Sequence, residues 1–207
     1  MPRKYQAVLL IGIPGSGKST QGKILAALPG TFYWEAGEVM RAIDAHSAVG
    51  QLIHQQSARG ELIPDELAVS ICLDDLTAHV KAGEYHPATD LLVLDGIPRT
   101  VRQAALLHEQ VEVIQVLHLV CEDVERIVQR ILRRATEQGR ADDADERVLR
   151  HRLDVYQRFT AGVLDFYPPE RVAPIEALIS PAEVFDQILH LVIPLLKRLQ
   201  GVPASDR

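Results

Sequence analysis

Cysteine is scarce in this chain. Cys72 and Cys121 are the only two among 207 residues, and no C-x-x-C pair occurs. A structural zinc site built from thiolates therefore has no support in the sequence. Both cysteines stand in apolar stretches, so we expect buried thiols in a reducing compartment, the cytoplasm. The eight histidines are scattered without the spacing of metal ligands, and no Ser/His/Asp arrangement suggests nucleophilic catalysis.

The chain also lacks an excess of basic residues and any long apolar run. Its formal net charge is −6, whereas nucleic-acid binding needs a basic surface. No apolar stretch is as long as a membrane span, and the N-terminus runs straight into a strand-like segment, which leaves no room for a signal peptide. We expect one soluble domain, residues 1–207, with one core and a small inserted lobe. No exposed apolar stripe suggests a dimer, so we expect a monomer.

What the sequence does contain is a phosphate-binding loop. Gly12, four residues, Gly17, Lys18 and Ser19 fit the G-x-x-x-x-G-K-[ST] pattern. An apolar run of strand length precedes the loop and a helical pattern follows it, which disfavours a plain Gly/Ser turn. The glycines let backbone N–H groups surround phosphate oxygens, and the helix N-terminus adds a positive dipole end. Lys18 supplies a cation for the terminal phosphates, and the Ser19 hydroxyl can bind Mg²⁺.

A second anchor is the apolar run 91–94 that ends in Asp95 and turns through Gly96 and Pro98 to Arg99. An aspartate at the mouth of a parallel sheet, beside a phosphate loop, suits magnesium and its water molecules. Arg99 is placed to meet a second anion. The alternative is that Asp95 only caps the turn that follows it.

The order of the segments predicts an α/β fold. Strand-like runs occur at about 6–11, 31–34, 91–95, 113–120 and 172–177, with helical patterns between them. This alternation predicts a five-stranded parallel sheet covered by helices on both faces. Ser180, Pro181 and Glu183 predict a capped start for the last helix. Two segments interrupt the alternation, residues 36–65 and 135–144, and we expect them to be a substrate lobe and a short cover at the carboxyl ends of the strands.

Arginines gather in one segment of this acidic chain. They occur at positions 126, 130, 133, 134, 140, 147, 150, 152 and 158. Such a cluster favours an anion site. A solvated helix held by i,i+4 ion pairs is the alternative, and it accounts for some of these arginines rather than all.

Together these motifs closely resemble the adenylate kinase family of nucleoside monophosphate kinases. The matching segments are residues 12–21, 36–41, 60–66, 95–104, 129–134, 139–143 and 152–156. Their order and spacing cover nearly the whole chain. The resemblance implies a phosphate-loop (P-loop) nucleoside triphosphate hydrolase-type fold with a monophosphate-binding lobe at 36–65 and a short lid at 135–144.

The resemblance also implies a role for each site residue. Those implied for ATP binding are Gly15, Ser16, Gly17, Lys18, Ser19, Thr20, Arg130, Arg134 and Ile179. Those implied for AMP binding are Ala36, Arg41, Gly96, Arg99, Gln103, Arg140 and Arg152, of which Gln103 would read the base. Those implied for catalysis are Lys18, Arg99, Arg134, Arg140 and Arg152. Asp142 and Asp143 would help the lid to close, and Mg²⁺ would be held by Ser19 and, through a water, by Asp95.

The implied reaction is magnesium-dependent, reversible phosphoryl transfer from ATP to AMP, giving two ADP by in-line displacement. This chemistry needs positioning and charge neutralisation, and the AMP phosphate is already a nucleophile. Two positions leave the acceptor open, because Ala36 replaces the usual threonine and favours UMP or CMP, whereas Gln103 suits adenine. Ser19 stands where the family usually has glycine, and 177–179 lack the glycine expected beside the donor base. A nucleotide-binding regulatory protein without turnover and a kinase for a non-nucleotide metabolite are the remaining alternatives.

Overall fold

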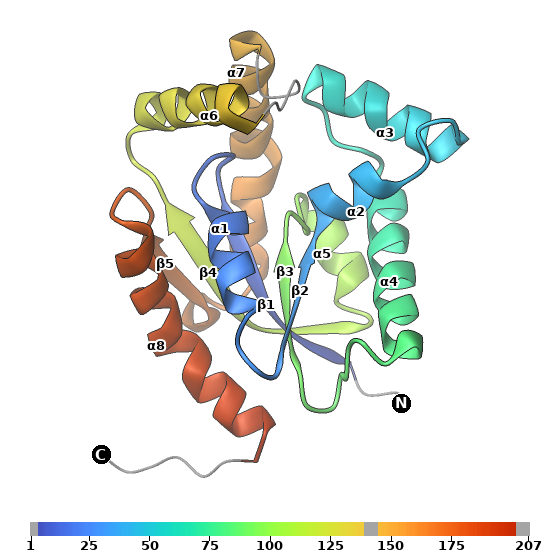
Figure 1. Ribbon diagram of the computed structural model, residues 1–207, viewed down its shortest axis with the longest axis vertical. Coiled ribbons are helices and arrows are strands. Elements are labelled where there is room, and N and C mark those ends of the chain that lie inside the picture. The colour runs from blue at the N-terminus through green and yellow to red at the C-terminus, as the bar shows by residue number, and fades with distance from the viewer. Residues whose placement is uncertain (1–3, 139–144, 202–207) are drawn as a thin grey trace.

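The computed structural model describes residues 4–138 and 145–201. Its sheet has five strands in the order β2-β3-β1-β4-β5, and each pairing is parallel. The strands are β1 (Tyr5–Gly12), β2 (Thr31–Glu35), β3 (Leu91–Asp95), β4 (Val111–Val120) and β5 (Val172–Glu176). Figure 1 shows this sheet between layers of helices. The predicted fold class and all five predicted strands are confirmed.

Strand β1 shows why helices cover both faces of the sheet. Its residues from 7 to 11 are all buried, and successive side chains point to opposite faces. Ala7, Leu9 and Ile11 join a core with α4 (Asp65–Ala82) and α5 (Val101–Leu107). Val8 and Leu10 join a second core with α1 (Lys18–Leu25) and α8 (Pro181–Leu199). A central parallel strand buried on both sides therefore reads as an unbroken apolar run.

One irregularity in β4 changes which face its side chains occupy. Ala7 pairs with Val113 and Val8 pairs with Gln115, so Ile114 is an extra residue on β4. Because of this bulge, Val113 and Val116 both face the core that contains α4 although they are three residues apart. Bulges re-aim side chains in this way.

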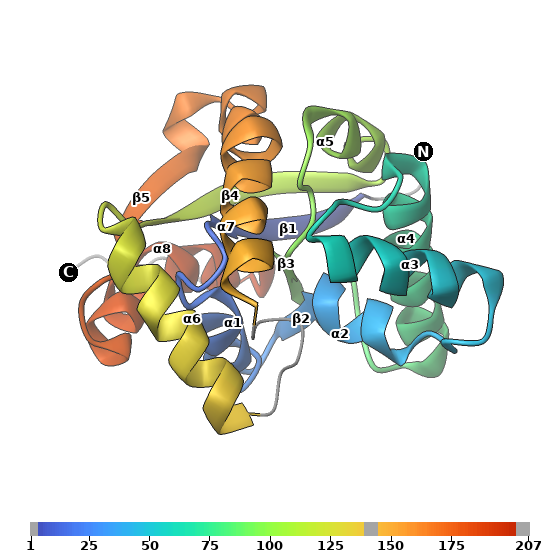
Figure 2. The same cartoon turned by 90° about the horizontal axis from the view of Figure 1, so that it is seen from above.

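The two segments that interrupt the alternation hold helices at the same end of the sheet. The first contains α2 (Ala36–Ala42) and α3 (Ala48–Arg59). Around the second lie α6 (Val124–Gln138) and α7 (Glu146–Val155), so α6 extends into the predicted lid, and residues 139–144 lie outside the described part. Figure 2 shows α6 and α7 above the sheet, with α2 and α3 beside them. A π-helical turn, Tyr156–Thr160, continues α7, followed by short 3₁₀ turns at Ala161–Phe166 and Pro169–Arg171.

The helix boundaries follow local chemistry. The predicted capping box of α8 is present, with the Ser180 side chain accepting from the Glu183 backbone N–H and the Glu183 side chain accepting from the Ser180 backbone N–H. Helix α4 ends at Gly83, which has a left-handed φ of 73°. Cys72 is buried as expected, but Cys121, just after β4, is only partly buried. In the described residues no helix is long and apolar enough to cross a membrane.

Candidate active site

The phosphate loop joins the carboxyl end of β1 to α1. Gly15 and Gly17 have φ values of 83° and 100°, a region that side chains other than glycine rarely adopt. Within the described residues no side chain caps the start of α1. The first N–H groups of this helix are therefore left for a ligand, as at anion-binding helix starts.

Lys18 folds back over this loop. Its Nζ donates to the carbonyl oxygens of Gly12 at 2.7 Å and of Ile13 at 3.0 Å. Ser16 is 2% exposed, and its Oγ has no hydrogen-bond partner among the described residues. A buried hydroxyl without a partner is costly, and a phosphate oxygen in the loop would satisfy it. Lys18 and Ser16 therefore both fit their predicted part in ATP binding.

Helix α6 covers the other side of the loop. A Cβ built on Gly15 would lie 2.6 Å from Ile131 Cδ1, and one built on Gly17 would lie 3.5 Å from Arg130 Nη2. Ile131 belongs to an apolar cluster that joins α6 to α7 and includes the loop residue Ile13. The structure therefore brings Arg130 to the phosphate loop, where a donor nucleotide would meet it.

Ser19 and Asp95 meet beside the loop. Ser19 Oγ donates to Asp95 Oδ2 at 2.9 Å, although the two residues are 76 positions apart. This donor set fits a magnesium ion, because the Ser19 hydroxyl keeps its lone pairs free while it donates its hydrogen bond to the carboxylate, and hard cations prefer oxygen ligands. Asp95 Oδ1 has no hydrogen-bond partner among the described residues and is free to accept from a magnesium-bound water.

Two residues of β2 that sequence reasoning missed also lie at this site. Tyr33 Oη is 2.9 Å from Asp95 Oδ2 and 3.1 Å from Glu35 Oε2. Burial, followed by the charges of Asp95 and Glu35, raises the pKa of Tyr33, so its hydroxyl stays protonated. The signal that could have found them is the sheet order, since β2 lies next to β3 and Glu35 pairs with Asp95.

The turn after β3 positions Arg99. Its Nε donates to the Gly96 carbonyl at 2.8 Å, and its own carbonyl accepts from Thr160 Oγ1 at 2.9 Å. Gly96 has a φ of 82°, and a Cβ there would lie 3.2 Å from Ala36 Cβ and 3.3 Å from Arg99 Nη2. Three residues predicted for AMP binding, Ala36, Gly96 and Arg99, are thus in contact.

Gln103 is more enclosed than a base-reading role suggests. It is 2% exposed, its Nε2 donates to Asp65 Oδ1 at 2.9 Å, and its Oε1 accepts from the Arg99 N–H at 2.7 Å. Asp65 Oδ1 also accepts from Thr100 Oγ1 at 2.9 Å. Reading adenine with Gln103 therefore requires the amide to give up or share these partners. The Asp65 contact spans 38 positions and has no local signal in the sequence.

Arg41, Thr20 and Ile179 lie further out. The Arg41 side chain is 52% exposed, with Nη2 3.7 Å from Glu35 Oε1. Thr20 is exposed on α1, and Ile179 is exposed in the loop between β5 and α8. Ile179 lies next to Leu178, which packs against the α6–α7 cluster.

Three basic side chains influence one another at the centre of the site, beside the carboxylate of Asp95. Burial, then the charges of Arg99 and Arg152, lowers the pKa of Lys18 from 10.5 to about 8 against the opposing effect of Asp95. Burial and then Arg152 lower the pKa of Arg99. These shifts place Lys18, Arg99 and Arg152 close enough to repel one another. Three neighbouring cations fit a polyanionic ligand.

Two other arginines of the cluster form ion pairs on the protein surface. Arg147 pairs with Asp145 at 3.1 Å, and Arg150 pairs with Glu125 at 3.2 Å and Glu146 at 2.7 Å. These pairs are exposed, so each adds little stability. The helix-surface alternative is therefore right for these two, while Arg130 and Arg152 lie at the site.

Part of the predicted lid falls outside the description. Arg140, Asp142 and Asp143 are not among the described residues, and of Arg134 only the backbone, within α6, is described. In the described part no group of three His, Cys, Asp or Glu residues could hold a metal ion.

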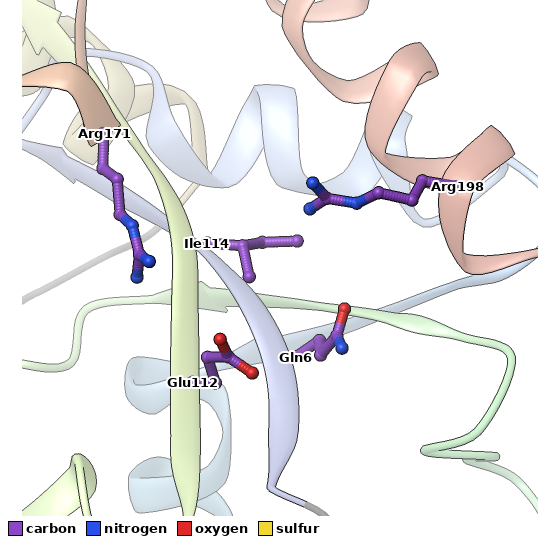
Figure 3. A pocket seen from close by; sticks show the side chains of 5 residues that line it. All are labelled: Gln6, Glu112, Ile114, Arg171 and Arg198. Carbon is purple, nitrogen blue, oxygen red and sulfur yellow. The ribbon is translucent and has the colours of Figure 1, made fainter. Parts of the chain in front are cut away.

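Two cavities lie away from this site. One is a hollow of about 300 Å³ at the amino ends of the strands, shown in Figure 3, and its lining residues are Gln6, Glu112, Ile114, Arg171 and Arg198. The other, of about 420 Å³, lies between α2 and α4, and its lining residues are Glu38, Val39, Ala42, Ile43, Asp75 and His79. Neither contains a residue predicted for catalysis.

Comparisons with known proteins agree on one family. A family model described as adenylate kinase matches residues 10–172. An adenylate kinase from Prochlorococcus marinus (strain MIT 9211) is 38% identical over 165 residues, which cover 77% of this chain and 82% of that protein. One from Synechococcus sp. (strain JA-2-3B'a(2-13)) is 37% identical over 173 residues, which cover 81% of this chain and 83% of that protein. One from Thermus thermophilus is 33% identical over 189 residues, which cover 88% of this chain and 95% of that protein.

Proposed function

We propose which residues carry out phosphoryl transfer from ATP to AMP in this chain, which belongs to the adenylate kinase family and has adenylate kinase activity. The observation that carries this proposal is the phosphate loop, with Lys18 folded over it and the buried Ser16 hydroxyl without a partner among the described residues; Arg99 and Arg152 add to the effect of burial in lowering the pKa of Lys18. Cations held together at a cost before substrate binds are preorganised for the charge of the transition state. When the phosphates bind, their negative charge relieves the repulsion among these cations.

We assign the donor side to the loop, α1 and α6. The N–H groups of residues 15–20 and the Ser16 hydroxyl bind the phosphates of ATP, and Lys18 bonds their terminal oxygens. Arg130 lies against the donor nucleotide, and Ile179 lies near its base. Ser19, and Asp95 through a water, would hold magnesium, which would supply charge neutralisation to the ATP phosphates.

We assign the acceptor side to α2 and the turn after β3. Arg41 and Arg99 clamp the AMP phosphate, Ala36 and Gly96 leave room beside it, and Gln103 reads the base after releasing Asp65. Residues 36–65 form the acceptor lobe. Arg134, just before the lid at residues 135–144, and Arg140 within it join Arg152 in neutralising the transferred group. Asp142 and Asp143 assist closure, which excludes water and limits ATP hydrolysis.

Acceptor choice tests this assignment. We expect product from Mg-ATP with AMP to form much faster than with UMP, CMP, GMP or no acceptor, as measured by chromatography. Gln103→Ala should reduce discrimination between AMP and UMP by about tenfold or more, since a site loses selectivity with its hydrogen-bonding group. Gln115→Ala is the matched control, because the Gln115 amide also donates a hydrogen bond through Nε2, to the Arg171 carbonyl, but stands apart from the site.

A preference for UMP or CMP would overturn the role of Gln103 and make Ala36 the deciding residue. Unchanged discrimination in folded Gln103→Ala would remove the base-reading role alone. We further propose that the protein is cytoplasmic and monomeric. Sedimentation of the full chain with and without nucleotides would test the monomeric state.

A further inference from the structure

Tyr33 connects three parts of the candidate site. It lies on β2, two residues before Glu35, so both side chains are on the same face of the strand. Its hydroxyl lies between two carboxylates, 2.9 Å from Asp95 Oδ2 and 3.1 Å from Glu35 Oε2. A phenol has one proton to donate, and the shorter distance is to Asp95.

The ring of Tyr33 is fixed by α1. A Cβ built on Gly22 would lie only 2.1 Å from Tyr33 Cε2 and 2.5 Å from its Cζ. The ring therefore rests directly on the backbone of the helix that begins at Lys18. This packing sets where the hydroxyl can go, independently of its hydrogen bonds.

Two donors then fix the orientation of the Asp95 carboxylate. Ser19 and Tyr33 both donate to Oδ2, and no described residue donates a hydrogen bond to Oδ1. A carboxylate held on one oxygen by donors from α1 and β2 presents the other oxygen in a fixed direction. Because Ser19 directly follows the phosphate loop, the carboxylate is held beside the place where magnesium would bind.

We propose that Tyr33 is a positioning residue for the magnesium site, acting by holding Asp95 through its hydroxyl. The inference rests on the proposed role of Asp95. Glu35 Oε2 lies 3.1 Å from the same hydroxyl, and Arg41 Nη2 lies 3.7 Å from the other oxygen of Glu35. Residues that orient a metal ligand influence metal affinity more than they influence fold.

The test is the affinity of Mn²⁺, as a paramagnetic substitute for Mg²⁺, for the full-length protein saturated with ADP. Free Mn²⁺ is measured by electron paramagnetic resonance, so the readout does not depend on turnover. Tyr33→Phe keeps the ring on Gly22 and removes only the hydroxyl. We expect Mn²⁺ to bind about tenfold more weakly, with ADP affinity in the absence of metal unchanged.

Tyr85→Phe is the matched control, because the Tyr85 hydroxyl is also buried but has no hydrogen-bond partner among the described residues. It should leave Mn²⁺ affinity unchanged. Asp95→Asn should weaken Mn²⁺ binding, and adding Tyr33→Phe to it should have little further effect, since the two act as a unit. Thermal unfolding of each variant sets a temperature at which all are folded.

The outcomes separate the inference from the function on which it rests. If Asp95→Asn weakens Mn²⁺ binding but Tyr33→Phe binds within twofold of the unmodified protein, the positioning role is wrong and that of Asp95 stands. If the two effects simply add, Tyr33 does not act through Asp95, and the inference is likewise wrong. If Asp95→Asn has no effect, the proposed magnesium site itself fails.

Discussion

The lowered pKa of Lys18 predicts how nucleotide affinity depends on pH. In the free protein this pKa is about 8 rather than 10.5, because burial and the nearby Arg99 and Arg152 disfavour the charged amine. Bound phosphates bring negative charge beside Lys18 and raise its pKa again. Between the two pKa values nucleotide binding must therefore take up a proton.

The size of the effect follows from linkage. A shift of this size corresponds to about 3 kcal/mol of differential interaction between the two protonation states. Because the free folded state holds this proton less tightly than the unfolded chain, Lys18 makes the free protein more stable as pH rises from about 8 to 10.5. Affinity for nucleotide runs the other way. It should fall about tenfold per pH unit above pH 8, or roughly 25-fold between pH 7.5 and 9.5.

Calorimetric titration with magnesium-ADP over that pH range measures this slope, and the nucleotide phosphates are already ionised there. Repeating it in buffers of different ionisation heat counts the protons taken up. Lys18→Met should bind more weakly and without the slope. A flat profile in the unmodified protein, or an equal slope in Lys18→Met, would show that Lys18 does not titrate in this range.

Three further substitutions test the loop, the core and a helix cap. In Gly15→Ala the alanine must adopt a left-handed φ and its Cβ meets Ile131, so we expect about 1–2 kcal/mol of lost stability and weaker ADP binding. Gly83→Ala is the control. Gly83 has a similar φ but nothing within 4 Å of the added Cβ, so this variant should lose stability without losing ADP affinity. Equal ADP affinities for the two variants would contradict the role of the loop. Leu76→Ala empties a fully buried position and should cost about 3 kcal/mol in urea unfolding. Ser180→Ala removes the α8 cap and should cost about 1 kcal/mol, and no measurable loss would show that the cap is dispensable.

The sequence predicted those parts of the site that are contiguous in the chain. The loop around Lys18 and the strand ending in Asp95 each have a local signature, because a tight turn needs glycine and a buried strand needs an apolar run. The start of α8 at Ser180 was predicted for the same reason. These features arise from neighbours along the backbone.

Contacts between distant segments escaped prediction. Tyr33 looked like any aromatic residue in a strand, and its partnership with Asp95 depends on β2 and β3 being adjacent. The bond between Gln103 and Asp65 depends on how α4 packs against α5. The ion pair of Arg150 with Glu125 on α6 likewise emerges only from helix packing. Charge and spacing raised the possibility of an anion site without saying which arginines belong to it.

The close fit of Tyr33 against Gly22 has a consequence for how this sequence can change over evolutionary time. A Cβ added at position 22 would lie only 2.1 Å from the Tyr33 ring. Position 22 therefore cannot gain a side chain while an aromatic side chain at position 33 stays in this place. A lineage that enlarges residue 22 must first accept a smaller residue at 33, and then needs another donor for Asp95. The two positions are therefore free to drift only as a pair, and the order of the steps is fixed by sterics.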